Sequence, residues 1–343
     1  MSEALAVLRV GMTCPVGLDA PQTTAAIRAG VARKLETSML DARLAPVILG
    51  HLADELLPPL DPSLAARGRL DPLEARMLRL ASGPLRELLS KQFSGATLPV
   101  HLAAPQGLVS ERFLPELARQ AGVGIEPSAS RVFAGGGASL FEAIIAARDQ
   151  LLIPGRAKFV IVGGVDSYFD ADRVEALERD GRLRTSGPQD ALTPGEAAAF
   201  VLLSTHAVCR RHSLAPLAWI TTVGLAMQTE QLLLGEGLAN AVSATLAHGS
   251  PEPIRSVMAG LNGESKAARE WGVALLRNRE HFAEPLRVQH PAELIGDAGA
   301  ALAPVMLGAA TLQLRARKLA GPTLVWARSD AGLRGALLLF AGA

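Results

Sequence analysis

The sequence predicts an α/β protein in which a mostly parallel sheet is covered by helices. Patterns typical of strands and helices alternate almost from end to end of the 343 residues, as expected when parallel strands are joined by helical crossovers. The apolar run from Phe159 to Val165 has no polar alternation, which favours a central strand buried on both faces. Hydrophobic residues make up 49% of the chain and charged residues 20%. This composition favours sheets with two buried faces or a large subunit interface.

The first round of elements begins with a strand over residues 5–12, an apolar run. A helix is expected to start near Pro21, with Asp19 as its cap, and to end at Gly30, because proline favours the first turn of a helix and glycine the position after the last. Apolar periodicity, bounded by proline and glycine, predicts the later elements of this round. They are helices over 44–57, 72–89, 111–120, 139–152 and 170–179, and strands over 98–104, 131–134, 159–165 and 197–203.

A second round has a similar order of elements, and it begins and ends with strands as the first does. It comprises strands over 217–225, 254–259, 323–328 and 335–340, and helices over 230–247, 265–276 and 296–314. The two rounds show no repeat at the level of residues, so a duplication is indicated only by the order of elements. No long linker separates them, and we expect two closely packed halves, 1–205 and 206–343.

Composition argues against several classes of function. The chain has a formal net charge of +1 and no basic block with interleaved aromatic residues, so nothing predicts nucleic-acid binding. The first residues lack the positive region of a secretory signal, and the apolar stretch 298–314 is short for a membrane span and contains Pro304. Two cysteines, Cys14 and Cys209, make no disulfide framework and are expected to be buried thiols in a reducing compartment. These observations favour a cytoplasmic protein without a membrane span.

Two short motifs could be taken for ligand sites. His206, Cys209 and His212 follow one another at every third position, but this spacing fits no zinc site and the two arginines between them oppose a cation. Three consecutive glycines at 135–137 precede a predicted helix and could cradle a phosphate. The rest of a nucleotide-binding fingerprint is missing, which favours a close-packed turn. We therefore expect neither a metal nor a cofactor.

Four segments resemble those of one enzyme family. They are Phe133-Ala-Gly-Gly-Gly-Ala-Ser139, Val162-Gly-Gly-Val-Asp-Ser167, Pro194-Gly-Glu-Ala-Ala-Ala-Phe200 and Leu294-Ile-Gly-Asp-Ala-Gly-Ala-Ala301. In order and spacing they are similar to segments of the β-ketoacyl-acyl-carrier-protein synthases of the thiolase superfamily. The resemblance implies a thiolase-like fold of two pseudo-repeated βαβαβ halves, layered α-β-α-β-α. Two five-stranded sheets would then enclose the helices over 139–152 and 296–314.

The same resemblance implies that the catalytic residues of the family are missing. The nucleophilic cysteine would lie in the turn that here offers Gly136 and Gly137. The first histidine of the family belongs to a turn that matches residues 257–264, which contain Gly260 and no histidine. Glu293 takes the place of the second histidine. We therefore expect no residue that catalyses ordinary condensation.

Other polar residues offer an alternative chemistry. Ser139 lies near the glycine turn, and five further residues are expected to approach the same mouth. They are Asn262, Glu264, Glu293, Asp297 and His290. An acyltransferase or hydrolase that uses Ser139 would need an adjacent base and an oxyanion hole. A serine near a helix start is more often a cap, so this is the lesser interpretation.

The sequence thus predicts a ketosynthase-like protein without condensing activity. Because degenerate ketosynthases act as partner subunits, the resemblance implies an interaction or assembly subunit or an adaptor. It would form a homodimer or a heterodimer with a related subunit, with its interface near residues 131–135, or would contact an acyl-carrier protein. A protein that binds acyl chains or pantetheine without reaction is a further alternative. A link to bacterial type VI secretion is an association without matching residues.

Overall fold

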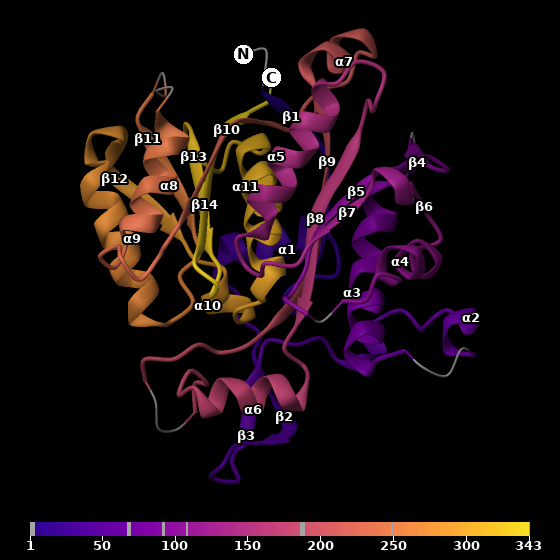
Figure 1. The fold of residues 1–343 in the computed structure, drawn as a ribbon, viewed down its shortest axis with the longest axis vertical. Coiled ribbons are helices and arrows are strands. Elements are labelled where there is room, and N and C mark those ends of the chain that lie inside the picture. The colour runs from indigo at the N-terminus through magenta and orange to yellow at the C-terminus, as the bar shows by residue number, and fades with distance from the viewer. Residues whose placement is uncertain are drawn as a thin grey trace.

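The computed structural model describes residues 4–66, 70–90, 93–107, 109–185, 189–247, 250 and 252–342. Within this part of the chain, ten strands form one continuous sheet rather than the two separate sheets expected, and it divides into two five-stranded units, one from each half (Figure 1). The first unit contains β1 (Leu5–Thr13), β5 (Val100–Ala103), β7 (Arg131–Phe133), β8 (Val160–Ser167) and β9 (Glu196–Thr205). The second contains β10 (Ala218–Met227), β11 (Ile254–Ala259), β12 (Phe282–Gln289), β13 (Thr323–Arg328) and β14 (Leu333–Ala341).

Both units have the same strand order: the third, second, fourth, fifth and first strand along the chain. The second strand runs parallel to the third and the fourth, and the fifth is antiparallel to both of its neighbours. The units meet where residues 5–7 of β1 pair with residues 218–220 of β10. This shared topology confirms the duplication that the order of elements in the sequence indicated.

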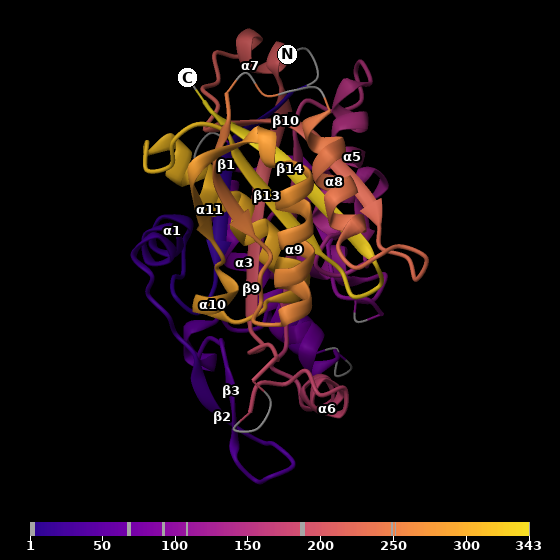
Figure 2. The ribbon, with the colours of Figure 1, turned by 90° about the vertical axis from the view of Figure 1, so that its left-hand side faces the viewer.

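Helices lie between the two units and on their outer faces (Figure 1). Between them, α5 (Ser139–Leu152) and α11 (Leu302–Arg315) each contact strands of both units. The outer helices include α3 (Pro72–Leu88) and α4 (Phe113–Ala121) beside the first unit, and α8 (Glu236–Leu246) and α9 (Ser265–Arg277) beside the second. Figure 2 shows α8 and α9 in front of β13 and β14. The predicted α-β-α-β-α layering is therefore confirmed.

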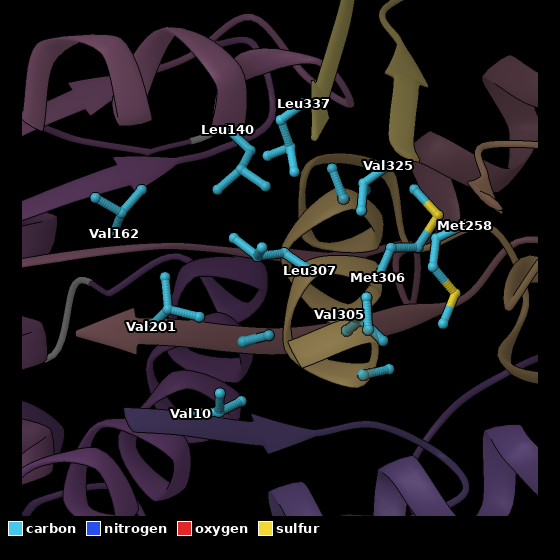
Figure 3. Close-up of a cluster of buried hydrophobic side chains, with 14 of the residues drawn as sticks. Val10, Leu140, Val162, Val201, Met258, Val305, Met306, Leu307, Val325 and Leu337 are labelled. Carbon is cyan, nitrogen blue, oxygen red and sulfur yellow. The ribbon is translucent and has the colours of Figure 1, made fainter. Parts of the chain in front are cut away.

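The core between the sheets is built around α11 (Figure 3). Its side chains lie among those of both units, with Val201 of β9 and Val325 of β13 in the same buried cluster. Gly308 in this helix has no room for a side chain, because a Cβ there would lie 2.6 Å from Met12 Sδ. Small residues thus allow one helix to pack closely between two sheets.

A small lobe projects below the two sheets in Figure 1. It consists of the hairpin β2 (Leu35–Leu40) and β3 (Pro46–Leu49) and of α6 (Ala171–Arg179), whose apolar side chains share one cluster. Further elements are α1 (Ala20–Ala29), α2 (Pro62–Ala65), α7 (His206–Arg211), α10 (Ala292–Ile295), β4 (Thr97–Leu98), β6 (Gly124–Ile125), and the 3₁₀ turns η1 (Asp54–Leu56), η3 (Pro127–Ala129), η4 (Arg279–His281) and η5 (Gly299–Ala301). Among the described residues, no helix is both long and apolar enough to cross a membrane.

Several boundaries agree with the sequence prediction because their signals are local. The helix over 139–152 and the strand over 254–259 have the predicted bounds. Helix α1 follows Asp19, whose side chain accepts a hydrogen bond from the amide of Gln22, and it ends at Gly30 with a φ of 70°. A side-chain cap at one end and a left-handed glycine at the other define this helix within its own sequence.

The predicted helix over 44–57 is wrong. Val47 and Leu49 are buried whereas Pro46 and Ile48 are exposed, which is the two-residue period of a strand. This segment instead forms β3, followed by η1.

The predicted helix over 296–314 is shorter than expected. Gly296 and Gly299 have positive φ values of 77° and 50°, so α11 begins only at Leu302. The predicted helix over 230–247 likewise begins late, at Glu236.

The sequence did not predict β12, a strand at the edge of the sheet. It is partly exposed along its length and contains Pro285, so it lacks the continuous apolar run of a central strand.

The boundary between halves at residues 205 and 206 stays a prediction. In the structure β9 ends at Thr205, and α7 leads from it toward β10.

Candidate functional site

A cleft opens between the two units at the carboxyl ends of their parallel strands. Its volume is about 290 Å³. The residues that line it include those that follow β5, β7, β8, β11 and β13 and those that precede α11. Ligands commonly bind at this edge of a parallel sheet, because the loops after the strands converge there. This cavity is hereafter the inner cleft.

The glycines at 135–137 form one wall of the inner cleft, directly before α5. Gly136 has a φ of 77°, in the left-handed region that favours glycine. A Cβ at Gly137 would lie 2.5 Å from the carbonyl oxygen of Arg328, so no side chain fits there unless the backbone moves. At Gly136 a Cβ would make only an ordinary van der Waals contact, 3.8 Å from Ser329 Oγ. The turn therefore brings the start of α5 close to the end of β13 and carries no nucleophile.

Ser139, the candidate nucleophile of the sequence analysis, supports this turn. Its side chain is buried, and its Oγ accepts a hydrogen bond of 2.9 Å from the amide of Gly135. In the described part of the chain, no histidine or carboxylate is hydrogen-bonded to Ser139. An acyl-transfer serine needs such a base within reach. The geometry therefore favours a structural role for this hydroxyl.

Asn262 and Asp297 are joined in the wall of the inner cleft. Asn262 Nδ2 donates to Asp297 Oδ2 at 2.7 Å, and the amide of Gly299 donates to Asp297 Oδ1 at 2.9 Å. Burial raises the pKa of Asp297, and these two hydrogen bonds oppose the shift only in part. Gly260, before Asn262, also lines the cleft. The turn that matches the one carrying the first histidine of the family therefore supplies the side-chain amide of Asn262 here.

Glu264 is held between two arginines. Its Oε1 and Oε2 accept hydrogen bonds of 2.7 and 3.1 Å from Arg182, and Oε2 accepts another from Arg328. Arg182 also donates to both carboxylate oxygens of Asp330, at 2.8 and 3.1 Å. Burial alone would raise the pKa of Glu264, but the hydrogen bonds from Arg182 and Asn262 outweigh it and hold the pKa below its ordinary value. Glu264 is thus an ionised, hydrogen-bonded group rather than a free acid or base.

Most of the charged residues of the inner cleft were not predicted from the sequence. Arg173 Nη1 binds Asp166 Oδ1 at 2.5 Å, and its guanidinium lies 3.8 Å from the centre of the Tyr168 ring. Burial raises the pKa of Tyr168, and the neighbouring carboxylates add to the shift, so the phenol stays protonated. The available signal was a charged residue at the end of a buried strand, as at Asp166 and Arg328. The residues missed are Asp166, Tyr168, Arg173, Arg182, Arg328 and Asp330.

Glu293 and His290 lie in a second cavity, hereafter the outer groove, rather than beside the glycine turn. Its volume is about 640 Å³. His290 Nδ1 and Glu293 Oε2 are 2.9 Å apart, and both side chains are exposed. Glu264 also lines the outer groove, and Asn262 lines both cavities. Asp297, which follows α10, is the carboxylate of this segment that reaches the inner cleft.

The two cysteines lie outside the inner cleft. Cys14 Sγ is buried 3.6 Å from Thr23 Oγ1, and Cys209 is buried in α7. Burial raises the pKa of both thiols. The described residues contain no group of three or more His, Cys, Asp and Glu side chains arranged to hold a metal ion. The described lining of the inner cleft therefore offers hydrogen bonds and paired charges, and no thiol.

No protein-family model matches the chain, and no curated protein matches it. Solved structures match over nearly its whole length. A chain of the AntDE:AntF complex, a type II PKS acyl-carrier protein with its ketosynthase bound to the hexaketide, has a TM-score of 0.78 at 12% identity, covering 99% of this chain and 100% of that chain. A chain of the ketosynthase ApeO in complex with its chain length factor ApeC from Xenorhabdus doucetiae has a TM-score of 0.76 at 15% identity, covering 98% of each.

A modular enzyme gives the same result. The ketosynthase from module 6 of the bacillaene synthase of Bacillus subtilis 168 has a TM-score of 0.79 at 14% identity, covering 98% of this chain and 72% of that chain. At such identities the likeness concerns the fold, and it confirms the fold that the four sequence motifs implied. The chain has the thiolase-like fold of the ketosynthases.

Proposed function

We propose that this protein is a ketosynthase-like subunit without condensing activity, which assembles with a catalytic ketosynthase in a polyketide- or fatty-acid-type system. The observation that carries the proposal is the glycine wall of the inner cleft. The carbonyl of Arg328 excludes a side chain at Gly137, and Gly136, where a Cβ would make only an ordinary contact, carries none. The glycine turn therefore supplies no thiolate nucleophile at the start of α5.

The charges of the cleft argue in the same direction. Condensation needs an activated nucleophile and hydrogen-bond donors that stabilise a developing negative charge. The side-chain amide of Asn262 already donates to Asp297 and Glu264. The guanidinium of Arg182 donates to Glu264 and Asp330. These donors are therefore committed to the carboxylates of the chain itself.

The similar solved structures support a protein partner. They include a ketosynthase with its chain length factor and a ketosynthase with its acyl-carrier protein. We propose by analogy that this chain pairs with a related subunit, as a homodimer or a heterodimer, and that an acyl-carrier protein is a further partner.

The edge strand β7 is the surface that we propose for this assembly. It pairs with β5 on one side and ends the ten-stranded order. The outer edge of such a strand carries amide and carbonyl groups that can pair with another chain. Arg131 is exposed there, and its guanidinium lies 4.8 Å from the centre of the Phe133 ring. Two such edges can form an isologous contact, which for a stable dimer buries more than about 1,000 Å² in total.

Assembly is tested by light scattering at micromolar concentration. The chain is measured alone and after co-expression with a candidate partner ketosynthase. We expect a homodimer or a complex with the ketosynthase. A monomer in both samples contradicts the assembly proposal.

Turnover is tested by intact-mass spectrometry after incubation with acyl-coenzyme A and with acyl-carrier protein. We expect no acyl adduct. A stable adduct that disappears in Ser139→Ala would contradict the non-catalytic role and favour acyl transfer by that serine. An adduct mapped to Cys14 or Cys209 is compared with the adduct formed by denatured protein, which identifies non-specific acylation.

A further inference from the structure

The inner cleft and the outer groove share one boundary. Asn262 lines both cavities, Arg182 lines the inner cleft and Glu264 lines the outer groove. Because Arg182 and Glu264 are joined by hydrogen bonds of 2.7 and 3.1 Å, their ion pair lies on that boundary. Through its contacts to Asp330, Arg182 ties the loop after α6 to a second loop of the carboxy-terminal unit.

The backbone of Arg182 is fixed, so the side chain is the part that can move. Its amide donates to the carbonyl of Leu177 at 2.8 Å, and its carbonyl accepts from the amide of Leu192 at 2.9 Å. A change of rotamer at Arg182 therefore opens the boundary without displacing the loop.

Two other arginine–glutamate pairs, each joined by two hydrogen bonds, serve as a comparison because their contacts are not expected to open. Glu196 binds Arg76 at 2.6 and 2.7 Å, and Glu270 binds Arg334 at 2.6 and 2.8 Å. Both glutamate side chains are 0% exposed. Separating the first pair would leave the buried Glu196 without an arginine. Separating the second would leave Arg334, 2% exposed, without a carboxylate, although Glu270 keeps Arg328 at 3.9 Å. A buried charge left in this way is strongly unfavourable.

The pair on the cavity boundary differs in this respect. When Arg182 leaves, Glu264 keeps Arg328 as a charged partner. The side chains of Arg182 and Asp330 are 26% and 64% exposed, so water can solvate both after they separate. Opening this pair therefore leaves no buried charge unpaired.

We propose that Arg182 is a latch between the two cavities. Bound to Glu264 and Asp330, it closes the boundary, and released, it joins the outer groove and the inner cleft into one passage to the glycine turn. A ligand or partner group with a phosphate or carboxylate would release it by competing for the guanidinium, which binds such planar or tetrahedral anions well. The inference deepens the proposed function and rests on it for the importance of the cleft, but its test needs no partner subunit.

Access to the inner cleft is measured with a reporter thiol. Ala327→Cys places one at a buried position of β13 that lines this cleft. Labelling with N-ethylmaleimide is followed by peptide mass spectrometry, so that the native Cys14 and Cys209 are read separately. Arg182→Ala should raise the labelling rate at residue 327 at least tenfold. The matched control Arg179→Ala removes an exposed arginine of α6 and should leave the rate unchanged.

Inorganic phosphate tests the release by an anion. At constant ionic strength, phosphate should raise the labelling rate at residue 327 when Arg182 is present and not in Arg182→Ala. No effect of phosphate in the first case overturns the anionic trigger. Equal labelling rates with and without Arg182 overturn the latch itself.

A general loosening of the fold gives a different result. It would accelerate labelling of Cys14 and Cys209 together with residue 327, and this outcome also overturns the latch, which opens only the boundary. If Ala327→Cys does not fold, Leu302→Cys at the start of α11 provides a second reporter in the same cleft. A failure of the proposed subunit assembly leaves all of these rates measurable on the single chain.

Discussion

The amino-terminal and carboxy-terminal units have the same strand order, but they differ at their outer edges. The third strand of the first unit, β7, has 3 residues, whereas its counterpart β12 has 8. β12 contains Pro285, which cannot donate a hydrogen bond to a further strand, and the exposed Glu284. β7 contains neither a proline nor an acidic residue. The comparison teaches that duplication of a fold leaves its two edges free to diverge, and that the proline and the acidic residue that oppose pairing lie on β12.

The starts of the two central helices show what the units retain in common. Ser329 Oγ, after β13, accepts a hydrogen bond of 2.9 Å from the amide of Ala138, directly before α5. Asp166 Oδ2, near the end of β8, accepts one of 2.9 Å from the amide of Ala300, shortly before α11. Each unit therefore satisfies an otherwise unpaired amide near a helix start of the other. The symmetry persists in hydrogen bonding although no repeat is visible in the sequence.

In each unit, a buried glutamate accepts two hydrogen bonds from one buried arginine, and removing either glutamate should have the largest effect on stability. In the first unit Glu196 binds Arg76, the amide of Leu52 and Ser167 Oγ. Glu196→Ala should lower the free energy of unfolding by about 3–5 kcal/mol. Buried Arg76 then keeps only the exposed Asp54, at 3.6 Å, as a counter-charge, and the amide of Leu52 loses its acceptor. Urea denaturation measures the loss.

The matched change in the second unit is Glu270→Ala. Both arginines keep carbonyl acceptors when their glutamate is removed. Among the described residues, however, Glu270 accepts hydrogen bonds from Arg334 alone, whereas Glu196 also accepts from the amide of Leu52 and from Ser167 Oγ. We therefore expect a smaller loss than for Glu196→Ala. A loss of the same size in both units would show that the additional hydrogen bonds of Glu196 contribute nothing.

The fold could be predicted where its signals are local. The bounds of α5 and the capped ends of α1 depend on residues within a few positions, and they agree with the structure. β12 and the hairpin β2–β3 depend on pairing with partners that a single sequence does not reveal, so they were missed. Where the apolar pattern of a segment is weak, tertiary contacts thus determine whether it forms a strand.

The inner cleft could be predicted only in part, because its charges meet across long stretches of chain. Arg182 and Glu264 are 82 residues apart in the sequence. Alignment with the family motif assigned Glu293 to the cleft, but the turn at Gly296, with a φ of 77°, is followed by Asp297 at that place. The turn geometry, and not the motif spacing, determines which carboxylate enters the cleft.

The glycine turn offers the next largest effect. Gly137→Ala should lower the free energy of unfolding by about 1–3 kcal/mol, because its Cβ would press on the backbone oxygen of Arg328. Gly272→Ala in α9 is the control from the other unit, since a Cβ there meets nothing within 4 Å. It should raise stability by up to about 1 kcal/mol through helix propensity. A loss at Gly272, or none at Gly137, would contradict the packing described for the turn.

The reciprocal caps predict a smaller effect. Ser329→Ala should lower the free energy of unfolding by about 1 kcal/mol, because the buried amide of Ala138 loses its acceptor. Hydrogen exchange at that amide should become faster in the variant. Ser128→Ala, which removes an exposed hydroxyl hydrogen-bonded to Glu126, is the control and should change neither quantity measurably.

The smallest effect, and the most specific, concerns two carboxylates of the second unit that share Asn262. The pKa of Glu264 is lowered, so its contribution to stability is present above its ordinary pKa of 4.5 and is lost as pH falls through the lowered value. The pKa of Asp297 is raised, so its contribution is present below the ordinary 3.8 and is lost as pH rises through the raised value.

Glu264→Gln and Asp297→Asn should therefore change stability with opposite dependence on pH. Glu264→Gln should cost more at neutral pH than in acid, because only the ionised carboxylate gains from Arg182 and Arg328. Asp297→Asn should cost less as pH rises, because the wild-type carboxyl is then forced to ionise while buried. Urea denaturation at a series of pH values, with each variant compared with wild type, measures both slopes. Slopes of the same sign would show that the two carboxylates do not divide the charge of the cleft as their contacts with Asn262 and the arginines imply.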